Sequence, residues 1–401
     1  MISLKYFLHK MNDVRVADLM AVFPMLVALA VSPFYEKKYK KAWLICEEPK
    51  EARDNGYWFF RKMCENHSEQ YCIYAIDKSS VDYEKVKNLG EVIQYGSLRH
   101  WIIYFTCQFN ISSQKGGKPN AALCSFIELN GFYKAHNIFL QHGIIINDLK
   151  WLYSECSRFD MIVTSVSLEK DFICEKFGYD NEIVRLTGLP RFDNLHNVVV
   201  KKNRIIIMPT WRQWFNLKSR KRKNLQSEFI NSEYLIKWKE FLQNKKLNDW
   251  IDEYQLEVIF YPHRNMQRYL QKFSENLNSK VIMASWEDYD LQELLKTSEM
   301  MITDYSSVFF DMVYMRKPVI FYQFDKNIFY KFQYERGYFD YESTPFGRSC
   351  TTLDSVLEEL HKMVKNKFKC TDDFVKAHKE YFKFYDDQNS ERVYEAVCGL
   401  K

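Results

Sequence analysis

The sequence predicts an α/β protein with two domains, each built around a parallel sheet. Short apolar segments of β-forming residues recur along the chain, and helix-like segments separate them. The first series is AWLIC (42–46), YCIYAI (71–76), WIIYFT (101–106), NIFLQ (137–141) and DMIVTS (160–165). The second is RIIIM (204–208), LEVIFY (256–261), KVIMA (280–284), EMMIT (299–303) and PVIFY (318–322). Because 401 residues exceed what one hydrophobic core usually supports, we expect two Rossmann-like halves.

The joint between the halves is expected at residues 195–203, where the polar and charged HNVVVKKN follows TGLPRFD (187–193). This places an N-terminal domain at residues 1–200 and a C-terminal domain at 201–401. Ligands of open α/β sheets bind beyond the carboxyl ends of the strands. We therefore expect the functional residues at the strand ends.

Charge and cysteine spacing exclude several classes of function. A net charge of +5 is too small to indicate a nucleic-acid partner. The ten cysteines include no CxxC pair and no spacing typical of a zinc site, so we expect reduced thiols. The sequence shows no secretory signal, and we expect a cytoplasmic protein.

Two segments favour contact with a membrane surface. The apolar run at residues 19–31 is interrupted by Pro24 and is shorter than the ~20 residues needed to cross a bilayer, so we expect it not to span alone. Four lysines follow it among tyrosines, which is typical of an interfacial helix on anionic lipid: Lys37, Lys38, Lys40 and Lys41. A helix buried in its own domain is the alternative. These features predict a peripheral location on the inner face of the membrane.

A basic segment at residues 218–223 is the second candidate for anionic contact. It contains Lys218, Arg220, Lys221, Arg222 and Lys223. Such a block binds anionic lipid or polymer, or is a solvated loop.

The segment Thr303–Ser307, TDYSS, is the sharpest local feature. It follows the predicted strand EMMIT and precedes the helix-like VFFDMVYM. A strand, a tight turn with two hydroxyls and then a helix can bind phosphate through hydroxyl groups and backbone N–H groups. Ordinary helix capping by Asp and Ser is the alternative.

Two further strand ends carry hydrogen-bond donors. VIFYPHR (258–264) delivers His263 and Arg264, and IIMPTWR (206–212) delivers Arg212. Imidazole and guanidinium groups both donate to phosphate oxygens. A diphosphate ligand would use all three strand ends.

In the first half, FLQHG (139–143) ends a strand with His142 beside Gly143. A glycine permits close approach to the backbone, and an imidazole with a pKa near ~6.5 accepts a proton at neutral pH. His142 is therefore the candidate general base, with a purely structural histidine as the alternative.

Together these motifs resemble the CDP-glycerol glycerophosphotransferase family of teichoic-acid and capsule enzymes. The segments that carry the resemblance are QHG (141–143), TGLPRFD (187–193), MPTWR (208–212), YPHR (261–264), DLQELL (290–295), ITDYSSVFFDMVYMRKPVIFY (302–322) and NSER (389–392). The resemblance implies a GT-B-like fold, with an acceptor domain and a donor domain facing a cleft and a final helix returning to the first domain.

The resemblance also implies roles for particular residues. It assigns catalysis to His142 and His263, and donor binding to Arg212, Arg264, Asp304, Ser306, Ser307 and Asp311. It assigns Gln141, Gly143 and Arg191 to the acceptor or the cleft. No strand end shows an acidic cluster that demands a metal, but Asp304 and Asp311 could recruit Mg²⁺.

The implied reaction is transfer of a polyol phosphate, glycerol or ribitol phosphate, from a CDP-activated donor to a hydroxyl of a surface polymer or its lipid-linked precursor, with release of CMP. A GT-B nucleotide-sugar glycosyltransferase and a non-catalytic scaffold are the alternatives. Residues 144–150, IIINDLK, replace the threonine-proline-leucine-lysine run common in teichoic-acid polymerases. This difference leaves the acceptor open.

Overall fold

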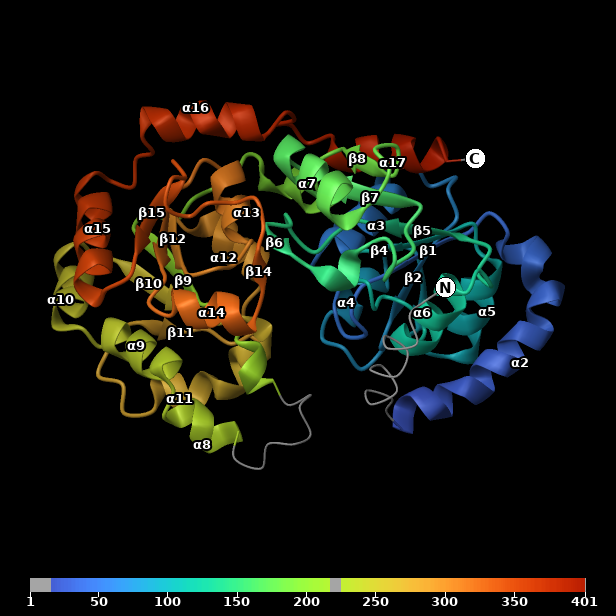
Figure 1. The fold of residues 1–401 in the computed structure, drawn as a ribbon, viewed down its shortest axis with the longest axis horizontal. Helices are drawn as coiled ribbons and strands as arrows, with labels where there is room; N and C mark the ends of the chain where they lie inside the picture. Colours follow the sequence, from blue (N-terminus) through green and yellow to red (C-terminus); the bar gives the residue numbers. More distant parts are fainter. Residues whose placement is uncertain (1–15, 217–224, 401) are drawn as a thin grey trace. The chain divides into compact units, whose positions relative to one another are not determined.

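The computed structural model describes residues 16–216 and 225–400, which form two compact α/β units (Figure 1). Unit 1 comprises the chain up to Ile144, Leu149–Asn194 and the segment from Asp386 onward. Unit 2 comprises Ile145–Asp148 and Leu195–Tyr385. The chain thus changes unit after Asn194, and its last segment belongs to unit 1. The basic segment predicted at 218–223 lies outside the described residues.

The sheet of unit 1 is parallel, with strand order β3-β2-β1-β4-β5-β7-β8. Its strands are β1 (Trp43–Cys46), β2 (Cys72–Ile76), β3 (Glu91–Gln94), β4 (Phe109–Ser112), β5 (His136–Phe139), β7 (Met161–Thr164) and β8 (Val184–Leu186). Its helices are α2 (Val16–Tyr39), α3 (Asn55–Asn66), α4 (Tyr83–Val86), α5 (Leu98–Thr106), α6 (Ala121–Leu129), α7 (Ser167–Phe177) and α17 (Asn389–Cys398).

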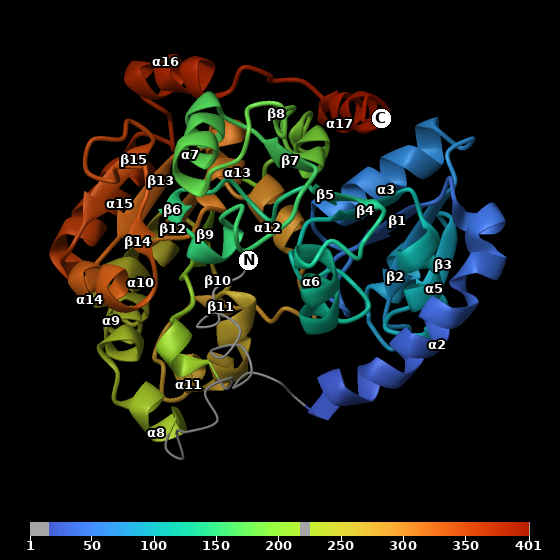
Figure 2. The same cartoon turned by 45° about the vertical axis from the view of Figure 1, so that its right-hand side comes forward.

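Helices cover both faces of this sheet (Figure 2). On one face α5 packs Trp101 and Ile103 into a core with Leu44 of β1 and Ile73 of β2. On the other face Phe59 of α3 stacks on Trp43, with ring centroids 6.2 Å apart. The strands are therefore apolar on both faces, as expected for a parallel sheet.

One predicted strand of unit 1 is wrong. The segment WIIYFT (101–106) lies in helix α5, and the strand follows at β4. The Ser97 side chain caps α5 by accepting a hydrogen bond from the His100 backbone N–H. Residues 101–106 are almost entirely apolar and mostly buried in α5, which packs against α2 and the sheet, so the segment resembles a buried strand.

The first helix is longer than predicted. We expected an apolar run interrupted by Pro24 and too short to span a membrane, but α2 continues through Pro24 and Pro33 for 24 residues. By length and composition alone it could cross a membrane, and 11% of its most apolar 18-residue window is buried. It packs on α5 through buried Ala28, and leaves Phe23 and Phe34 75% and 87% exposed.

The main sheet of unit 2 is also parallel, with strand order β11-β10-β9-β12-β13-β15. Its strands are β9 (Arg204–Met208), β10 (Glu257–Phe260), β11 (Ile282–Met283), β12 (Met300–Thr303), β13 (Val319–Tyr322) and β15 (Gly347–Cys350). A separate antiparallel pair joins β6 (Asn147–Asp148) to β14 (Glu335–Arg336).

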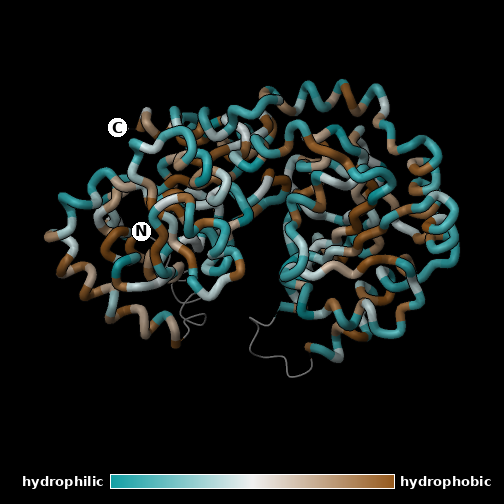
Figure 3. The backbone as a smooth tube through the Cα atoms, turned by 180° about the vertical axis from the view of Figure 1, so that it is seen from behind, coloured by the Kyte–Doolittle hydropathy of each residue, from teal (hydrophilic) through white to brown (hydrophobic). Residues whose placement is uncertain are grey.

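The helices of unit 2 are α8 (Leu225–Ile230), α9 (Glu233–Leu242), α10 (Lys245–Glu253), α11 (Leu270–Ser274), α12 (Leu291–Thr297), α13 (Phe309–Tyr314), α14 (Lys326–Phe332), α15 (Leu353–Lys365) and α16 (Asp372–Tyr381). Trp238 of α9 is fully buried in a core with Phe260 and Tyr322. The hydrophobic strand segments lie inside each unit (Figure 3).

Both sheets have a topological switch point, where successive connections leave in opposite directions. It lies between β1 and β4 in unit 1 and between β9 and β12 in unit 2. In such sheets ligands bind beyond the carboxyl ends of the strands at this point. The predicted motifs follow strands at or next to the two switch points.

Candidate active site

In unit 2, the loops after β9 and β12 are tied together at the switch point. The Asp304 carboxylate accepts hydrogen bonds from the backbone N–H groups of Thr210 and Tyr305, at 2.7 and 2.8 Å. Its second oxygen accepts from Arg212 at 2.8 Å. The structure thus brings two of the predicted donor-site residues into direct contact.

Arg212 is completely buried among acidic and aromatic side chains. Its guanidinium is paired with Asp304 and Asp325, each at 2.8 Å, and lies 5.2 Å from the ring centroid of Tyr305. Burial disfavours the cation, but the two carboxylates outweigh it and raise the pKa of Arg212. Arg212 and Asp304 are both 0% exposed, and their hydrogen bonds tie the loops after β9 and β12 together. Their assignment to the diphosphate stays a prediction.

His263 presents a defined ring tautomer at the end of β10. Its Nδ1 accepts a hydrogen bond from the Asn265 backbone N–H at 3.2 Å, so a neutral ring carries its proton on Nε2. The ring is half-buried and lies 6.1 Å from the Trp211 ring. The tautomer makes Nε2–H a hydrogen-bond donor, which suits a phosphate oxygen.

Arg264 begins the 3-10 helix η4 (Arg264–Tyr269), and its guanidinium lies 4.5 Å from the ring centroid of Trp286. It is half-buried, unlike Arg212. The Trp286 ring thus holds the guanidinium in place by a cation–π contact.

The TDYSS segment forms a turn before α13, as predicted. The Ser306 hydroxyl accepts from the Val308 backbone N–H at 3.3 Å within the turn, and Ser306 is 7% exposed. The N-cap of α13 is Val308, which has no side-chain capping hydrogen bond. Ser307 is half-buried. Asp311 lies inside α13 and is 2% exposed.

The acidic residues of this region do not fit a magnesium site. Both oxygens of Asp304 are occupied by Arg212 and backbone N–H groups, and Asp311 is buried in a helix. Across residues 16–216 and 225–400, no group of three or more His, Cys, Asp or Glu side chains is arranged to hold a metal ion.

In unit 1, His142 follows β5 and lies against the start of α3. Its Nδ1 is 2.5 Å from the Asp54 carboxylate, and its side chain is 59% exposed. The Gln114 amide, in the loop after β4, lies 2.7 Å from the same ring nitrogen. An exposed ring held on one side is compatible with a proton acceptor.

Arg191 joins the two partners. Its guanidinium donates to Asp54 Oδ1 at 3.0 Å and to the His142 carbonyl at 2.7 Å, and it is 6% exposed. Arg191 thus lies beside His142 and holds both Asp54 and the His142 backbone.

The charges in this cluster shift two pKa values. The surrounding protein disfavours the His142 cation, but the charge and hydrogen bond of Asp54 outweigh it and raise the pKa of His142. Burial would raise the pKa of Asp54, but His142 and Arg191 outweigh it and lower that pKa. Both shifts favour the charged forms, so Asp54 and His142 attract each other most strongly when the carboxyl is ionised and the imidazole is protonated.

Gln141 has an internal role. Its backbone has a positive φ of 65°, and its side chain is fully buried and donates to Val163 O and to Glu169 at 2.7 and 3.0 Å. The backbone carbonyl of Gln141 accepts a hydrogen bond from the Asn55 side-chain amide at 2.7 Å. Gln141 therefore shapes the turn that presents His142, while Gly143 beside it is buried.

The sequence interpretation missed Asp54, Glu47 and Gln114. Each directly follows a strand or begins a helix: Glu47 after β1, Gln114 after β4 and Asp54 as the N-cap of α3. Their positions at the unit 1 switch point were the available signal, but WIIYFT was assigned as the strand in place of β4.

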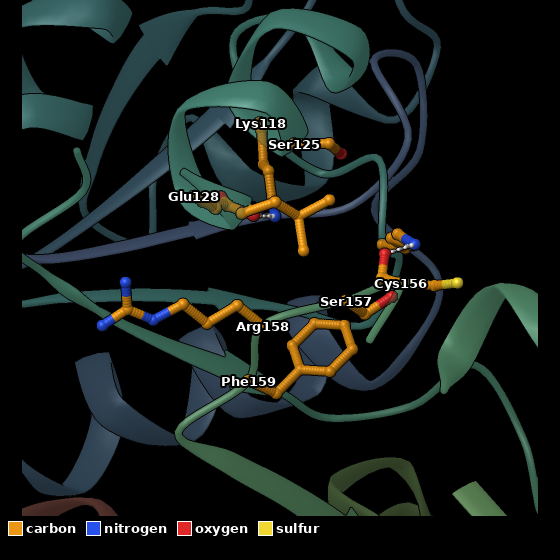
Figure 4. Close-up of a pocket in the computed structure, with 9 residues that line it drawn as sticks. Lys118, Ser125, Glu128, Cys156, Ser157, Arg158 and Phe159 are labelled. Carbon is orange, nitrogen blue, oxygen red and sulfur yellow. Dashed lines mark hydrogen bonds and ion pairs between the residues drawn. The ribbon is translucent and has the colours of Figure 1, made fainter. Parts of the chain in front are cut away.

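A small hollow elsewhere in unit 1 does not fit a charged ligand (Figure 4). Lys118 and Glu128 both line it. They pair with each other at 2.5 Å and are 2% and 3% exposed. Lys115, which also lines the hollow, donates to the carbonyls of Trp151 and Cys156, and His142 is not among the lining residues.

The two parallel Rossmann-like units define a GT-B-like fold, which the comparisons with known proteins support. The structure is similar to a solved structure of the wall teichoic acid polymerase TagF, with a TM-score of 0.68 and 19% sequence identity. The match covers 96% of this chain and 98% of that chain. That polymerase had been soaked with CDPG.

Residues 27–399 match the family described as CDP-glycerol:poly(glycerophosphate) glycerophosphotransferase. The chain belongs to this family.

Two relatives are named for the synthesis of teichoic acids. The chain is 29% identical over 369 residues to the minor teichoic acid biosynthesis protein GgaB of Bacillus subtilis, covering 90% of this chain and 40% of that protein. It is 27% identical over 266 residues to the teichoic acid poly(ribitol-phosphate) polymerase of Bacillus spizizenii, covering 59% of this chain and 37% of that protein. The chain thus spans well under half the length of these two relatives.

Proposed function

We propose that this protein transfers a polyol phosphate from a CDP-activated donor to a hydroxyl of a cell-surface polymer or its lipid-linked precursor. The reaction forms a phosphodiester and releases CMP. The observation that carries the proposal is the match to the family over residues 27–399, whose strand-end motifs gather at the switch point of unit 2. The polyol is glycerol or ribitol, since relatives are named for both polymers.

The donor diphosphate is assigned to unit 2. His263 donates from Nε2–H, because its Nδ1 already accepts from Asn265. Arg264 and the half-buried Ser307 supply further donors, and Ser306 shapes the turn. Arg212 and Asp304 act indirectly, by fixing the loops after β9 and β12. Phosphoryl transfer depends mainly on such positioning and on charge stabilisation.

The acceptor is assigned to unit 1, where His142 is the general base. The acceptor oxygen attacks the polyol-side phosphorus and forms the new P–O bond, while its proton passes to His142 Nε2. The P–O bond to the bridging oxygen breaks, and that oxygen leaves with the electron pair as part of CMP. The donors of unit 2 stabilise the charge that develops on the leaving phosphate.

A panel of donors tests the substrate assignment. The protein is incubated with CDP-glycerol, CDP-ribitol and UDP-sugars, each with a polyol-phosphate acceptor, and free nucleotides are measured. We expect CMP from one or both CDP-polyols. Turnover of UDP-sugars alone would contradict the proposal and favour a glycosyltransferase.

We also propose that the protein acts at the cytoplasmic face of the membrane, held there by α2. The support is the exposed apolar surface of Phe23 and Phe34 and the exposed lysines 37, 38, 40 and 41 at the end of the helix. Apolar burial together with cationic side chains is the pattern that binds anionic interfaces.

A further inference from the structure

The Asp54 carboxylate divides its two oxygens between different partners. Oδ1 accepts from the backbone N–H of Asn55 at 2.8 Å and from the Arg191 guanidinium at 3.0 Å. Oδ2 faces His142 Nδ1 at 2.5 Å. Asp54 is 6% exposed and caps α3, so its orientation is fixed by the helix.

We propose that Asp54 is the positioning residue for His142: it holds the ring proton on Nδ1 and leaves the lone pair on Nε2 for the acceptor hydroxyl. This inference rests on the proposed function for its catalytic meaning. The tautomer itself follows from chemistry, because a carboxylate only accepts hydrogen bonds and the ring nitrogen facing it must therefore carry the proton.

The Arg191 guanidinium agrees with this assignment. Arg191 neutralises the far side of Asp54 and also holds the His142 carbonyl, so ring and carboxylate are fixed by one guanidinium. Glu47 is the other acidic group that acts on His142, and its carboxylate is fully buried at the start of α3. Gln114 Nε2 lies 2.7 Å from the same ring nitrogen and is a donor, so an Nδ1–H ring requires the Gln114 amide to turn its oxygen to Nδ1; the charged Asp54 carboxylate outweighs this neutral amide. The His142 side chain is 59% exposed.

The division of the Asp54 oxygens predicts what an asparagine would do. The partners of Oδ1 are both donors, so the amide oxygen of Asp54→Asn stays there. The amide nitrogen then faces His142 Nδ1 and donates to it. The ring proton moves to Nε2, and that nitrogen can no longer accept a proton from the acceptor hydroxyl. The substitution keeps the shape of the site but reverses the tautomer.

The test combines the tautomer with the kinetics. The tautomer and pKa of His142 are measured by ¹⁵N NMR of the histidine-labelled protein, assigned against His142→Gln, in the wild type and in Asp54→Asn. We expect Nδ1–H in the wild type and Nε2–H in the variant, with a lower His142 pKa. We expect kcat to fall about 100-fold or more while KM changes little.

Asp82→Asn is the matched control. Asp82 is a buried carboxylate of the same unit that pairs with Arg53 at 2.7 Å and accepts from the Ala52 backbone N–H. We expect it to change stability without moving the tautomer, the pKa of His142 or the pH profile.

The outcomes separate this inference from the proposed function. An Nε2–H tautomer in the wild type, or a His142 pKa unchanged in Asp54→Asn, overturns the positioning role whatever the enzyme does. If the wild type turned over no CDP-polyol, the proposed function would fail, and the NMR result would still decide the positioning role.

Discussion

At the level of single residues, Arg212 and Arg264 show how similar motifs acquire different roles. Both follow a strand in unit 2, and the sequence assigned both to the diphosphate. Arg212 is enclosed by Asp304 and Asp325, whereas Arg264 is half-buried against Trp286. The difference arises from Asp325, which lies 113 residues away in the chain and could not be paired with Arg212 by spacing.

Replacing Arg212 by Met leaves two buried carboxylates without their cation. We expect a loss of about 3–5 kcal/mol in the free energy of unfolding, because breaking a buried pair from one side strands the remaining charge. Urea denaturation measures the loss. The control is Arg204→Met, whose partner Glu257 is 25% exposed, and there we expect a loss of about 0–1 kcal/mol. Equal losses in the two variants would show that the buried cluster of Arg212, Asp304 and Asp325 contributes no more to stability than the more exposed Arg204–Glu257 pair.

The pH dependence of the wild type tests the His142 assignment. A general base must be neutral, and Asp54 raises the pKa of His142 above its ordinary value of 6.5. The base is therefore protonated and inactive below that raised pKa, and kcat/KM rises with pH to a midpoint above 6.5. A midpoint at or below 6.5 in a kcat/KM profile contradicts this.

The sequence placed His142 at the end of a strand, and the structure places it three residues after β5, but the sequence did not point to Asp54. The two residues lie 88 positions apart in the chain and meet only in the folded protein: Asp54 precedes α3, in the connection after β1, whereas His142 follows β5. Local spacing finds residues that share a motif. It does not find partners that come from different connections.

At the level of elements, α3 begins with a carboxylate already in place. Glu47 accepts from the backbone N–H groups of Arg53, Asp54 and Tyr57 at 2.7–3.1 Å, and it lies so close to Gly56 that a Cβ there would be 2.9 Å from Glu47 Cγ. The backbone N–H groups that could bind an anion at this switch point are thus already occupied by a carboxyl group of the chain itself. This supports the assignment of the nucleotide to unit 2.

The ionisation of Glu47 gives a stability prediction. Burial, with the charge of Asp54, raises the pKa of Glu47 from 4.5 to about 8. The unfolded chain therefore loses this proton first, and the group makes stability fall as pH rises from 4.5 to about 8. We expect Glu47→Gln to reduce the fall between pH 5 and pH 8, on the order of a few kcal/mol, in urea denaturation. A fall as steep as that of the wild type would show that Glu47 keeps an ordinary pKa.

Helix α2 was predicted in part: its apolar character was read correctly, but its extent was not, because the apolar run was expected to be interrupted at Pro24, whereas Pro24 and Pro33 both lie within the helix. A proline inside a helix is tolerated where neighbouring packing holds the segment, here against α5. Residues 101–106, which were predicted as a strand, lie in α5 and pack against α2.

Substituting Phe23 and Phe34 by Ser tests membrane contact. Both side chains are at least 75% exposed, so we expect the fold to be retained and binding to anionic vesicles in flotation to fall at least tenfold. Val199→Ser is the control, since Val199 is 85% exposed outside the helix. Unchanged binding of the double variant would remove α2 as the contact.

At the level of the whole molecule, the chain is not divided simply into two halves. Residues from Asp386 onward belong to unit 1, where the Asp193 carboxylate accepts from the backbone N–H groups of Asn389 and Ser390 at 2.7 and 2.9 Å. The two series of strands predicted two Rossmann-like units, and this is confirmed. The return of the last helix was implied by the family resemblance of NSER and not by any periodicity.

The central proposal is that this molecule breaks a P–O bond and makes a phosphodiester. The decisive measurement is ³¹P NMR of the products formed from the donor that is turned over. We predict CMP together with a polymer-linked phosphodiester that contains the polyol-side phosphorus of the donor. Release of the nucleoside diphosphate with a glycosidic product and no phosphodiester would contradict it.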